Sequence, residues 1–223
     1  DEKPVQVFPL ISKYRFRIGT TWHTVWFPSD ELFPQRAGLR PGEYYEKGED
    51  VIKLKVKSGD HLFVDRMTYN FRKPKRGEII VFETQGIPLL KQDTFYIKRL
   101  VGLGDEELQI GDDQHLRVNG RRLDAADPHF ENVYSFDRDW RPESYFGHAN
   151  MKVVRDNRVR TSMDNFKYFP NGEHVFKVRP DHYVVLGDNT LNSFDSRGWG
   201  DFPQEKVIGK SFFVYWPISE RFG

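Results

Sequence analysis

The chain has 223 residues, a formal net charge of +1 and no cysteine. The near-neutral charge does not demand a nucleic-acid partner, and the lack of cysteine excludes disulfides, thiol nucleophiles and thiolate metal sites. The seven histidines form no i, i+4 pair and no His-x-His pattern, so we expect no metal and no cofactor. No run approaches the roughly 18 apolar residues of a membrane helix. Aromatic residues are abundant, which favours strands over helices.

Residues 1–50 give weak signals and are predicted to form an irregular extension or insertion. The segment Arg15–Phe27 alternates weakly and could hold a strand or two. The prolines and glycines of Pro28–Gly42 indicate a long loop. Trp22, Trp26 and Phe27 are bulky apolar residues in the first of these segments. An exposed cluster of these residues could touch a membrane surface, but we favour packing onto the body of the domain.

From residue 51 the strand signals are clear. Ile52–Val56 alternates strictly, His61–Asp65 follows a turn, and Glu78–Phe82 is apolar enough to be buried on both faces. Between them lies the basic loop Arg72–Gly77, which could bind phosphate or simply be solvated. No aromatic or glycine-rich partner motif accompanies it, and this favours the solvated loop.

The functional interpretation depends on the next predicted strand, Tyr96–Gly102. Successive side chains of a strand point to opposite faces, so Tyr96, Lys98 and Leu100 share one face. We expect a lysine between an aromatic residue and a leucine to be buried, and burial lowers the pKa of its amine. A neutral lysine can act as a general base near neutral pH. The alternative is that Lys98 and Arg99 are ordinary surface charges.

The remaining elements are also predicted to be strands. Hairpins with turns such as Asn119-Gly120 extend to Leu123, whereas residues 124–175 are polar, aromatic and irregular. His182–Leu186 and Ser211–Trp216 return to a clear strand pattern. We therefore predict a mainly β protein with antiparallel sheets. Its β core would comprise residues 51–123 and 176–223, with an inserted accessory region over 124–175.

A loop rich in short polar side chains and glycines follows the strand that ends at Leu186. Within it, Asp195 and Arg197 could pair and fix the loop, and Ser193 or Ser196 could donate a hydrogen bond to a neutral amine. A lysine of depressed pKa needs this kind of support. An ordinary structural loop is the alternative.

Three segments taken together resemble type I signal peptidases of the bacterial serine–lysine class. They are Ser58–Asp65 with its continuation Lys75–Phe82, then Tyr96–Leu103, and then Gly187–Gly200. The resemblance implies antiparallel β-sheets of the signal-peptidase type. It also implies site residues: Lys98 as the general base, Ser193 hydrogen-bonded to the lysine amine, and Asp188, Asn189, Asp195 and Arg197 as structural support.

The sequence departs from this family at the nucleophile. The family has a serine followed by methionine, proline, threonine and an apolar residue, shortly before the Gly-Asp pair that matches Gly59-Asp60. Residues 47–57 contain no serine, Ser58 is too close to Gly59, and Ser162-Met163 lies far downstream and continues differently. Two hypotheses follow. Either the nucleophile and an N-terminal membrane helix precede Asp1 in a longer native protein, or the chain is an inactive relative.

The resemblance implies a membrane-associated serine endopeptidase that removes signal peptides from exported preproteins, on the extracytoplasmic side of the bacterial cytoplasmic membrane. Neutral Lys98 would take the proton from a serine hydroxyl, and the signal peptide, with small residues at −1 and −3, would bind as an added strand. The expected partners are signal peptides and the membrane surface, without nucleic acid or metal.

Two other classes of function stay open at this stage. The first is a catalytically silent relative that only binds preproteins or a partner. The second is a self-cleaving repressor-type regulator, which shares the serine–lysine β fold. That class should carry a DNA-binding helical module and a cleavable Ala-Gly or similar linker, and the sequence shows neither.

Overall fold

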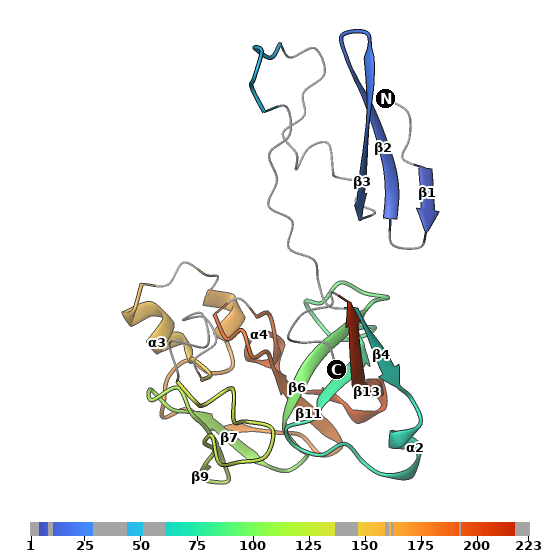
Figure 1. The fold of residues 1–223 in the computed structure, drawn as a ribbon. Coiled ribbons are helices and arrows are strands. Elements are labelled where there is room, and N and C mark those ends of the chain that lie inside the picture. Colours follow the sequence, from blue (N-terminus) through green and yellow to red (C-terminus); the bar gives the residue numbers. More distant parts are fainter. Residues whose placement is uncertain are drawn as a thin grey trace. The chain divides into compact units, whose positions relative to one another are not determined.

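The structure is a computed structural model, and it divides the chain into two compact units, residues 1–58 and 59–223 (Figure 1). It describes residues 5–8, 11–28, 44–50, 61–136, 147–158, 161, 163–191 and 193–216. The strand predicted at Ile52–Val56, the turn at Ser58–Asp60 and the Ser162 position lie outside the described residues. Each unit is considered by itself below.

The first unit contains a three-stranded antiparallel sheet in the order β1-β2-β3, formed by β1 (Val5–Phe8), β2 (Ile11–Ile18) and β3 (Thr21–Pro28). Gly19 lies between β2 and β3 with a φ of 58°, the left-handed conformation that a two-residue hairpin turn needs. Where we predicted an irregular extension with a strand or two, the structure has three strands. The alternation is weak in the sequence because large apolar side chains, including Trp22 and Trp26, stand on the exposed face as well.

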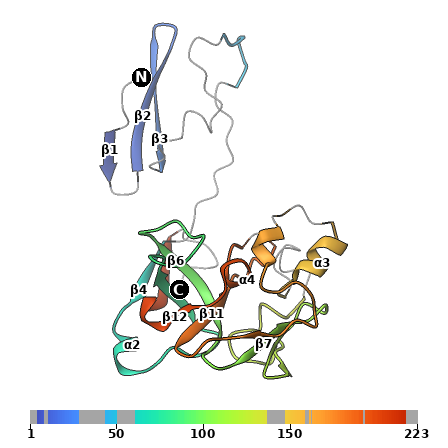
Figure 2. The ribbon, with the colours of Figure 1, turned by 180° about the vertical axis from the view of Figure 1, so that it is seen from behind.

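The second unit is built on a six-stranded antiparallel sheet in the order β12-β11-β6-β5-β13-β4 (Figure 2). Its strands are β4 (His61–Asp65), β5 (Ile79–Glu83), β6 (Phe95–Gly102), β11 (His182–Leu186), β12 (Phe202–Pro203) and β13 (Val207–Trp216). The predicted mainly antiparallel β fold is confirmed.

A second, four-stranded antiparallel sheet has the order β10-β7-β8-β9. It consists of β7 (Glu107–Ile110), β8 (Leu116–Val118), β9 (Arg121–Arg122) and β10 (Phe176–Lys177). The predicted Asn119-Gly120 turn joins β8 to β9, and both residues have positive φ, 49° and 78°. This is the conformation for which an Asn-Gly hairpin turn is favoured.

The helices of the second unit are short. They are α2 (Thr68–Phe71), α3 (Met151–Asp156) and α4 (Ser196–Trp199), with the 3-10 turns η2 (Met163–Phe166) and η3 (Gln204–Lys206). Both α3 and η2 fall in the region predicted as an insertion, 124–175. Described residues of that region, such as Phe130 and Phe169, are buried in the core. The boundaries proposed for the insertion stay a prediction.

Strand β11 and the last residues of β6, Leu100–Gly102, lie between two parts of the core and are buried on both faces. Leu100 and Val185 belong to a cluster with Phe82 and Trp199, whereas Val101 and Val184 belong to a cluster with the four-stranded sheet. A short, continuously apolar segment such as Tyr183–Leu186 is typical of a strand covered on both faces. The end of β11, where the polar loop begins, is therefore held rigidly by packing on both sides.

Candidate active site

Lys98 lies in β6, opposite Ile80 of β5, and its side chain is half-buried. The Nζ atom is 5.8 Å from the centre of the Tyr96 ring, on the face of the strand that the alternation predicted. Burial lowers the pKa of the Lys98 amine; the positive charge of Arg197 lowers it further, against the raising effects of Asp195 and Asp188. Lys98 is therefore not an ordinary surface charge.

An aromatic row connects the Lys98 face of β6 with the loop after β11. Tyr96 packs edge-on against Trp199 with ring centres 6.1 Å apart, and Trp199 packs edge-on against Phe194 at 5.1 Å. These rings are apolar neighbours on the lysine side of the strand. They exclude water, which is the physical cause of the desolvation that disfavours the ammonium form.

Ser193 lies against Gly187, the residue that follows β11, because Gly187 has no side chain. The register of β11 with β6 pairs Val185 with Leu100 and Leu186 with Arg99, where β11 ends. A Cβ at Gly187 would lie only 2.0 Å from the Oγ of Ser193. The serine hydroxyl therefore occupies the space that any other residue at 187 would fill.

The hydrogen bond predicted between Ser193 and the lysine amine is not formed in this structure. Ser193 is buried, and its Oγ has no hydrogen-bond partner in the part of the chain that the structure describes. The hydroxyl lies against Gly187. Ser196, the other hydroxyl considered, accepts a hydrogen bond from the Val185 amide at 3.0 Å.

Asp195 and Arg197 pair as the sequence suggested, and both are fully buried. The guanidinium donates to the Asp195 carboxylate from Nε at 2.9 Å and from Nη2 at 2.7 Å. Its other hydrogen bonds go to the Thr190 hydroxyl (2.7 Å), the Thr190 carbonyl (2.7 Å) and the Ala149 carbonyl (3.1 Å). All five donors of the arginine are used, and the Phe166 ring lies 4.8 Å from its central carbon.

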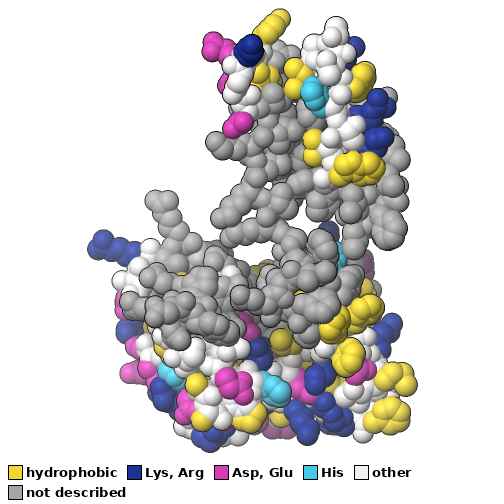
Figure 3. Space-filling view, viewed as in Figure 1, with side chains coloured by type: hydrophobic (Ala, Val, Ile, Leu, Met, Phe, Trp, Pro, Cys, Tyr) yellow, Lys and Arg dark blue, Asp and Glu magenta, His cyan; other side chains and the backbone are white. Residues whose placement is uncertain are grey.

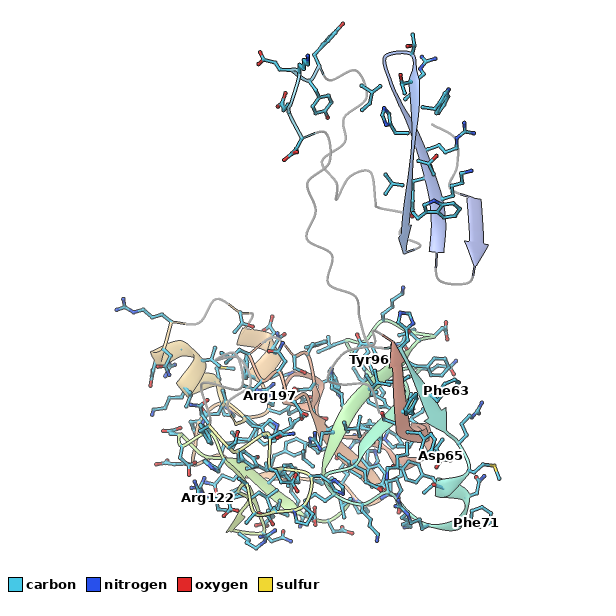
Figure 4. The ribbon with its side chains drawn as sticks, viewed as in Figure 1. Phe63, Asp65, Phe71, Tyr96, Arg122 and Arg197 are labelled. Carbon is cyan, nitrogen blue, oxygen red and sulfur yellow. The ribbon has the colours of Figure 1, made fainter. Side chains whose placement is uncertain are left out.

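The Asp195 carboxylate also fixes the loop to the end of β11. It accepts a hydrogen bond from the Gly187 amide at 2.9 Å and one from the Arg197 amide at 3.2 Å, which caps the short helix α4. Burial by itself raises the pKa of Asp195, but the charge and hydrogen bonds of Arg197 outweigh it and lower the pKa overall. The ionised pair is thus stable inside the fold, and Figure 4 shows Arg197 at α4.

Asp188 is held from the neighbouring strand. Arg99 donates to its carboxylate from Nε at 2.8 Å and from Nη2 at 2.6 Å, and a third hydrogen bond joins Arg99 to the Gly77 carbonyl at 2.7 Å. Arg99 is therefore a buried partner of the loop and not a surface charge. Asn189, the next predicted support residue, is half-buried beside it.

Sequence reasoning missed several residues of this site: Arg99, Ala149, Phe166 and Thr190. Thr190 stands within the loop and its hydroxyl was a visible signal. Ala149 contributes only its backbone carbonyl and Phe166 only the face of its ring. No sequence pattern predicts either contact. Both come from the region that we predicted to be an accessory insertion.

Two cations of the basic loop over Arg72–Gly77 are paired with the protein's own carboxylates, whereas Lys73 and Lys75 are exposed. Arg72 donates to Glu78, and Arg76 forms an ion pair with Glu106. This agrees with the preference for a structural loop over a phosphate site. Within the described ranges, no group of three or more His, Asp or Glu side chains could hold a metal ion. The same residues include no helix that is both long and apolar enough to cross a membrane.

The family model described as "Signal peptidase, peptidase S26" matches residues 49–216, which include Lys98 and the whole loop that carries Asp195 and Arg197. The chain belongs to the signal peptidase family S26. Among curated relatives, a probable signal peptidase I-2 of Synechocystis is 32% identical over 160 residues, covering 71% of this chain and 56% of the relative.

Two further proteins are similar to this chain. A signal peptidase I of Leptolyngbya laminosa is 30% identical over 167 residues, covering 72% of this chain and 62% of the relative. A crystal structure of a signal peptidase I from Enterococcus faecalis V583 is 27% identical, with a TM-score of 0.38, and the match covers 63% of this chain and 98% of that one. The chain thus spans about three fifths of the length of the curated relatives.

Proposed function

We propose that this chain is part of a membrane-associated serine endopeptidase that removes signal peptides from exported preproteins, with Lys98 as the general base. The observation that carries the proposal is the half-buried Lys98 amine, whose pKa burial lowers, in a chain of the S26 family. The relatives are named signal peptidase I. By analogy with the family, the site would face the extracytoplasmic side of the bacterial cytoplasmic membrane.

Lys98 would act through its neutral form. The amine accepts the proton of a serine hydroxyl while the serine oxygen bonds to the scissile carbonyl carbon, and the resulting ammonium then gives that proton to the leaving amine. The amine next takes a proton from water, whose oxygen attacks the carbonyl carbon of the acyl ester, and the ammonium returns this proton to the serine oxygen as the ester bond breaks. We assign no residue of this chain as the nucleophile.

Ser193 is proposed to support the amine. A buried hydroxyl without a partner is unfavourable by about 1–3 kcal/mol, and the Ser193 Oγ is such a group. Rotation about its Cα–Cβ bond would let it donate to the free pair of a neutral lysine amine. Gly187 leaves room on that side of β11, and the Asp195–Arg197 pair holds the loop in place.

The edge of β6 next to Lys98 offers a place for an extended substrate. β5 pairs with residues 95–99 of β6 on one side, whereas β11 pairs on the other side only with Arg99, Leu100 and Gly102. In the described part of the chain, no strand pairs with Phe95–Lys98 along that second edge. A signal peptide that bound there as an added strand would place its scissile carbonyl close to Lys98. Backbone hydrogen bonds to β6 would supply much of the affinity.

The test is cleavage of a peptide with an Ala-x-Ala site by the longest native form that contains this sequence. Lys98→Ala should lower kcat by at least the 10²–10⁴-fold that general bases usually contribute. The matched control is Lys177→Ala, an exposed lysine at the end of the other sheet, which should retain full activity. Undiminished cleavage by Lys98→Ala would refute the role of Lys98. Preprotein binding without cleavage by the unmodified protein would instead support a catalytically silent relative.

A further inference from the structure

One face of the three-stranded sheet in the first unit combines cations with tryptophans. In the β2–β3 register, Lys13 stands opposite Trp26 and Arg17 opposite Trp22, with Arg15 between them in β2. Directly opposed residues of an antiparallel pair, and every second residue along each strand, share a face. These five residues therefore line one surface, here called the basic tryptophan face. Tyr14 points to the other side of the sheet and is buried.

The basic tryptophan face is exposed. Trp22 and Trp26 keep 49% and 57% of their surface accessible, and Arg15 and Arg17 are also exposed. Figure 3 shows Lys or Arg side chains beside hydrophobic ones along this unit. Between Val5 and Pro28 the sequence has three cations, Lys13, Arg15 and Arg17, and no Asp or Glu, so this segment carries a net positive charge. Such a surface is complementary to an anionic partner that also accepts indole rings.

The arrangement of the side chains distinguishes between anionic partners. The Arg15 guanidinium lies 4.9 Å from the Trp22 ring centre, and the Lys13 Nζ lies 5.8 Å from that of Trp26. A cation thus covers one face of each indole, and a base of single-stranded nucleic acid would need such a face for stacking. Lipid headgroups make no such demand. An indole can lie at the depth of the headgroups while the cation on its ring contacts a phosphate, and neither interaction uses a free ring face.

We propose that the basic tryptophan face binds the surface of a bilayer that contains anionic phospholipids. The two indoles would sit at headgroup depth, and Lys13, Arg15 and Arg17 would lie against the phosphates. This binding surface belongs to the first unit and does not depend on Lys98 or on peptidase activity. It gives the first unit a function of its own, which is to attach the protein to a membrane surface.

The experiment measures partition of the full chain onto phosphatidylcholine vesicles with 30% phosphatidylglycerol, at low and at physiological salt. Each cation near such a surface contributes about five-fold in affinity, so Lys13→Gln/Arg15→Gln/Arg17→Gln should bind about 100-fold more weakly. The charge-matched control Lys73→Gln/Lys91→Gln/Lys177→Gln removes three exposed lysines of the second unit. It should lose less than about three-fold. Equal losses in the two variants would overturn the proposal.

A second measurement does not depend on the triple variant folding. Brominated phosphatidylcholine in the same vesicles should quench the tryptophan fluorescence of the wild-type chain, and Trp22→Phe/Trp26→Phe should remove most of that quenching. Arg17→Gln alone should weaken partition about five-fold. Unchanged quenching in the tryptophan variant would overturn the proposal. Tighter binding to a single-stranded oligonucleotide than to the vesicles would overturn it as well.

Discussion

Asp195 and Arg197 stand two residues apart, are both fully buried, and are joined by side-chain hydrogen bonds of 2.9 and 2.7 Å. The pair connects the loop after β11 to the Ala149 carbonyl, which is more than forty residues away in the sequence. It thereby ties the end of β11, the serine loop and the region before α3 into one structure. The stability of the site should depend on this pair.

Removing one member of the pair should be strongly destabilising. Arg197→Met leaves a buried carboxylate without its cation, and we expect the free energy of unfolding to fall by about 3–5 kcal/mol. Asp195→Leu/Arg197→Met should be less unstable than the sum of the single changes, because it leaves no isolated charge. Chemical denaturation measures both effects. The control is Arg121→Met, which breaks the exposed pair with Asp127 and should change stability by no more than about 1 kcal/mol. Additive losses in the double variant would contradict this account.

Lys98→Met should stabilise the fold near neutral pH. Because burial lowers the pKa of Lys98 in the folded state, the folded protein binds its proton less tightly than the unfolded chain does. The charged amine is therefore unfavourable at pH values below its folded pKa. This penalty fades as the pH rises from the folded pKa to the usual lysine value of about 10.4. We expect a gain at pH 7 within the range of about 0.5–2 kcal/mol that stabilising substitutions give.

The difference between wild type and Lys98→Met should shrink between pH 7 and pH 10. Denaturant unfolding of both proteins at each pH measures it, and effects of other titrating groups cancel in the comparison. A methionine variant that is less stable at pH 7 would show that the amine is not disfavoured by its surroundings. A gain that stays constant with pH would exclude titration of Lys98 as its cause.

Gly187→Ala should disturb the serine loop. The new Cβ would lie 2.0 Å from the Oγ and 2.6 Å from the Cβ of Ser193, while the backbone at Gly187 is not in the left-handed region that would by itself disfavour alanine. Overpacking of this kind is unfavourable by about 1–3 kcal/mol. Gly187→Ala/Ser193→Gly should recover most of the loss, because it removes the two atoms that clash. Urea unfolding of both variants is the measurement, and an equally unstable double variant would contradict the steric explanation.

Glu78 should stabilise the fold in a pH-dependent way. Burial by itself raises the pKa of Glu78, but hydrogen bonds from Arg72, the Lys75 amide and Lys210 outweigh it and lower the pKa to about 2. The folded state thus holds the carboxylate ionised at a pH where the unfolded chain has protonated it. Its stabilising contribution is complete above the ordinary value of 4.5 and is lost as the pH falls from there to about 2.

Glu78→Gln should therefore be less stable than wild type by about 1–3 kcal/mol at pH 7, since it weakens charge-assisted hydrogen bonds around a buried side chain. The two proteins should converge in stability as the pH approaches 2. Unfolding curves recorded from pH 7 downward test this. A difference that persists unchanged at the acid end would mean that the carboxylate is not the titrating group.

Local patterns in the sequence were enough to locate the central strand and its lysine. The placement of Lys98 between Tyr96 and Leu100 on one strand face, and the continuous apolar run Tyr183–Leu186, reflect burial on one or both faces, which is a property of each strand by itself. The Asn119-Gly120 turn could also be predicted, because its backbone conformation suits those two residue types. The weak pattern of the first unit was harder to read, since tryptophans stand on the exposed face of β3.

By itself, then, the sequence determined the antiparallel β character of the chain, and it only suggested the burial of Lys98 and the pairing of Asp195 with Arg197. The tertiary structure decided between these interpretations and their alternatives. It also decided which groups satisfy that arginine, how Arg99 holds Asp188, and that Ser193 lies against Gly187 without a hydrogen-bond partner among the described residues. The reason is physical. Strand alternation and turn preferences depend on residues that are close together in the sequence, so they can be predicted from it. The contact made by a backbone carbonyl, or by the space at a glycine, depends on which distant residue the fold places next to it.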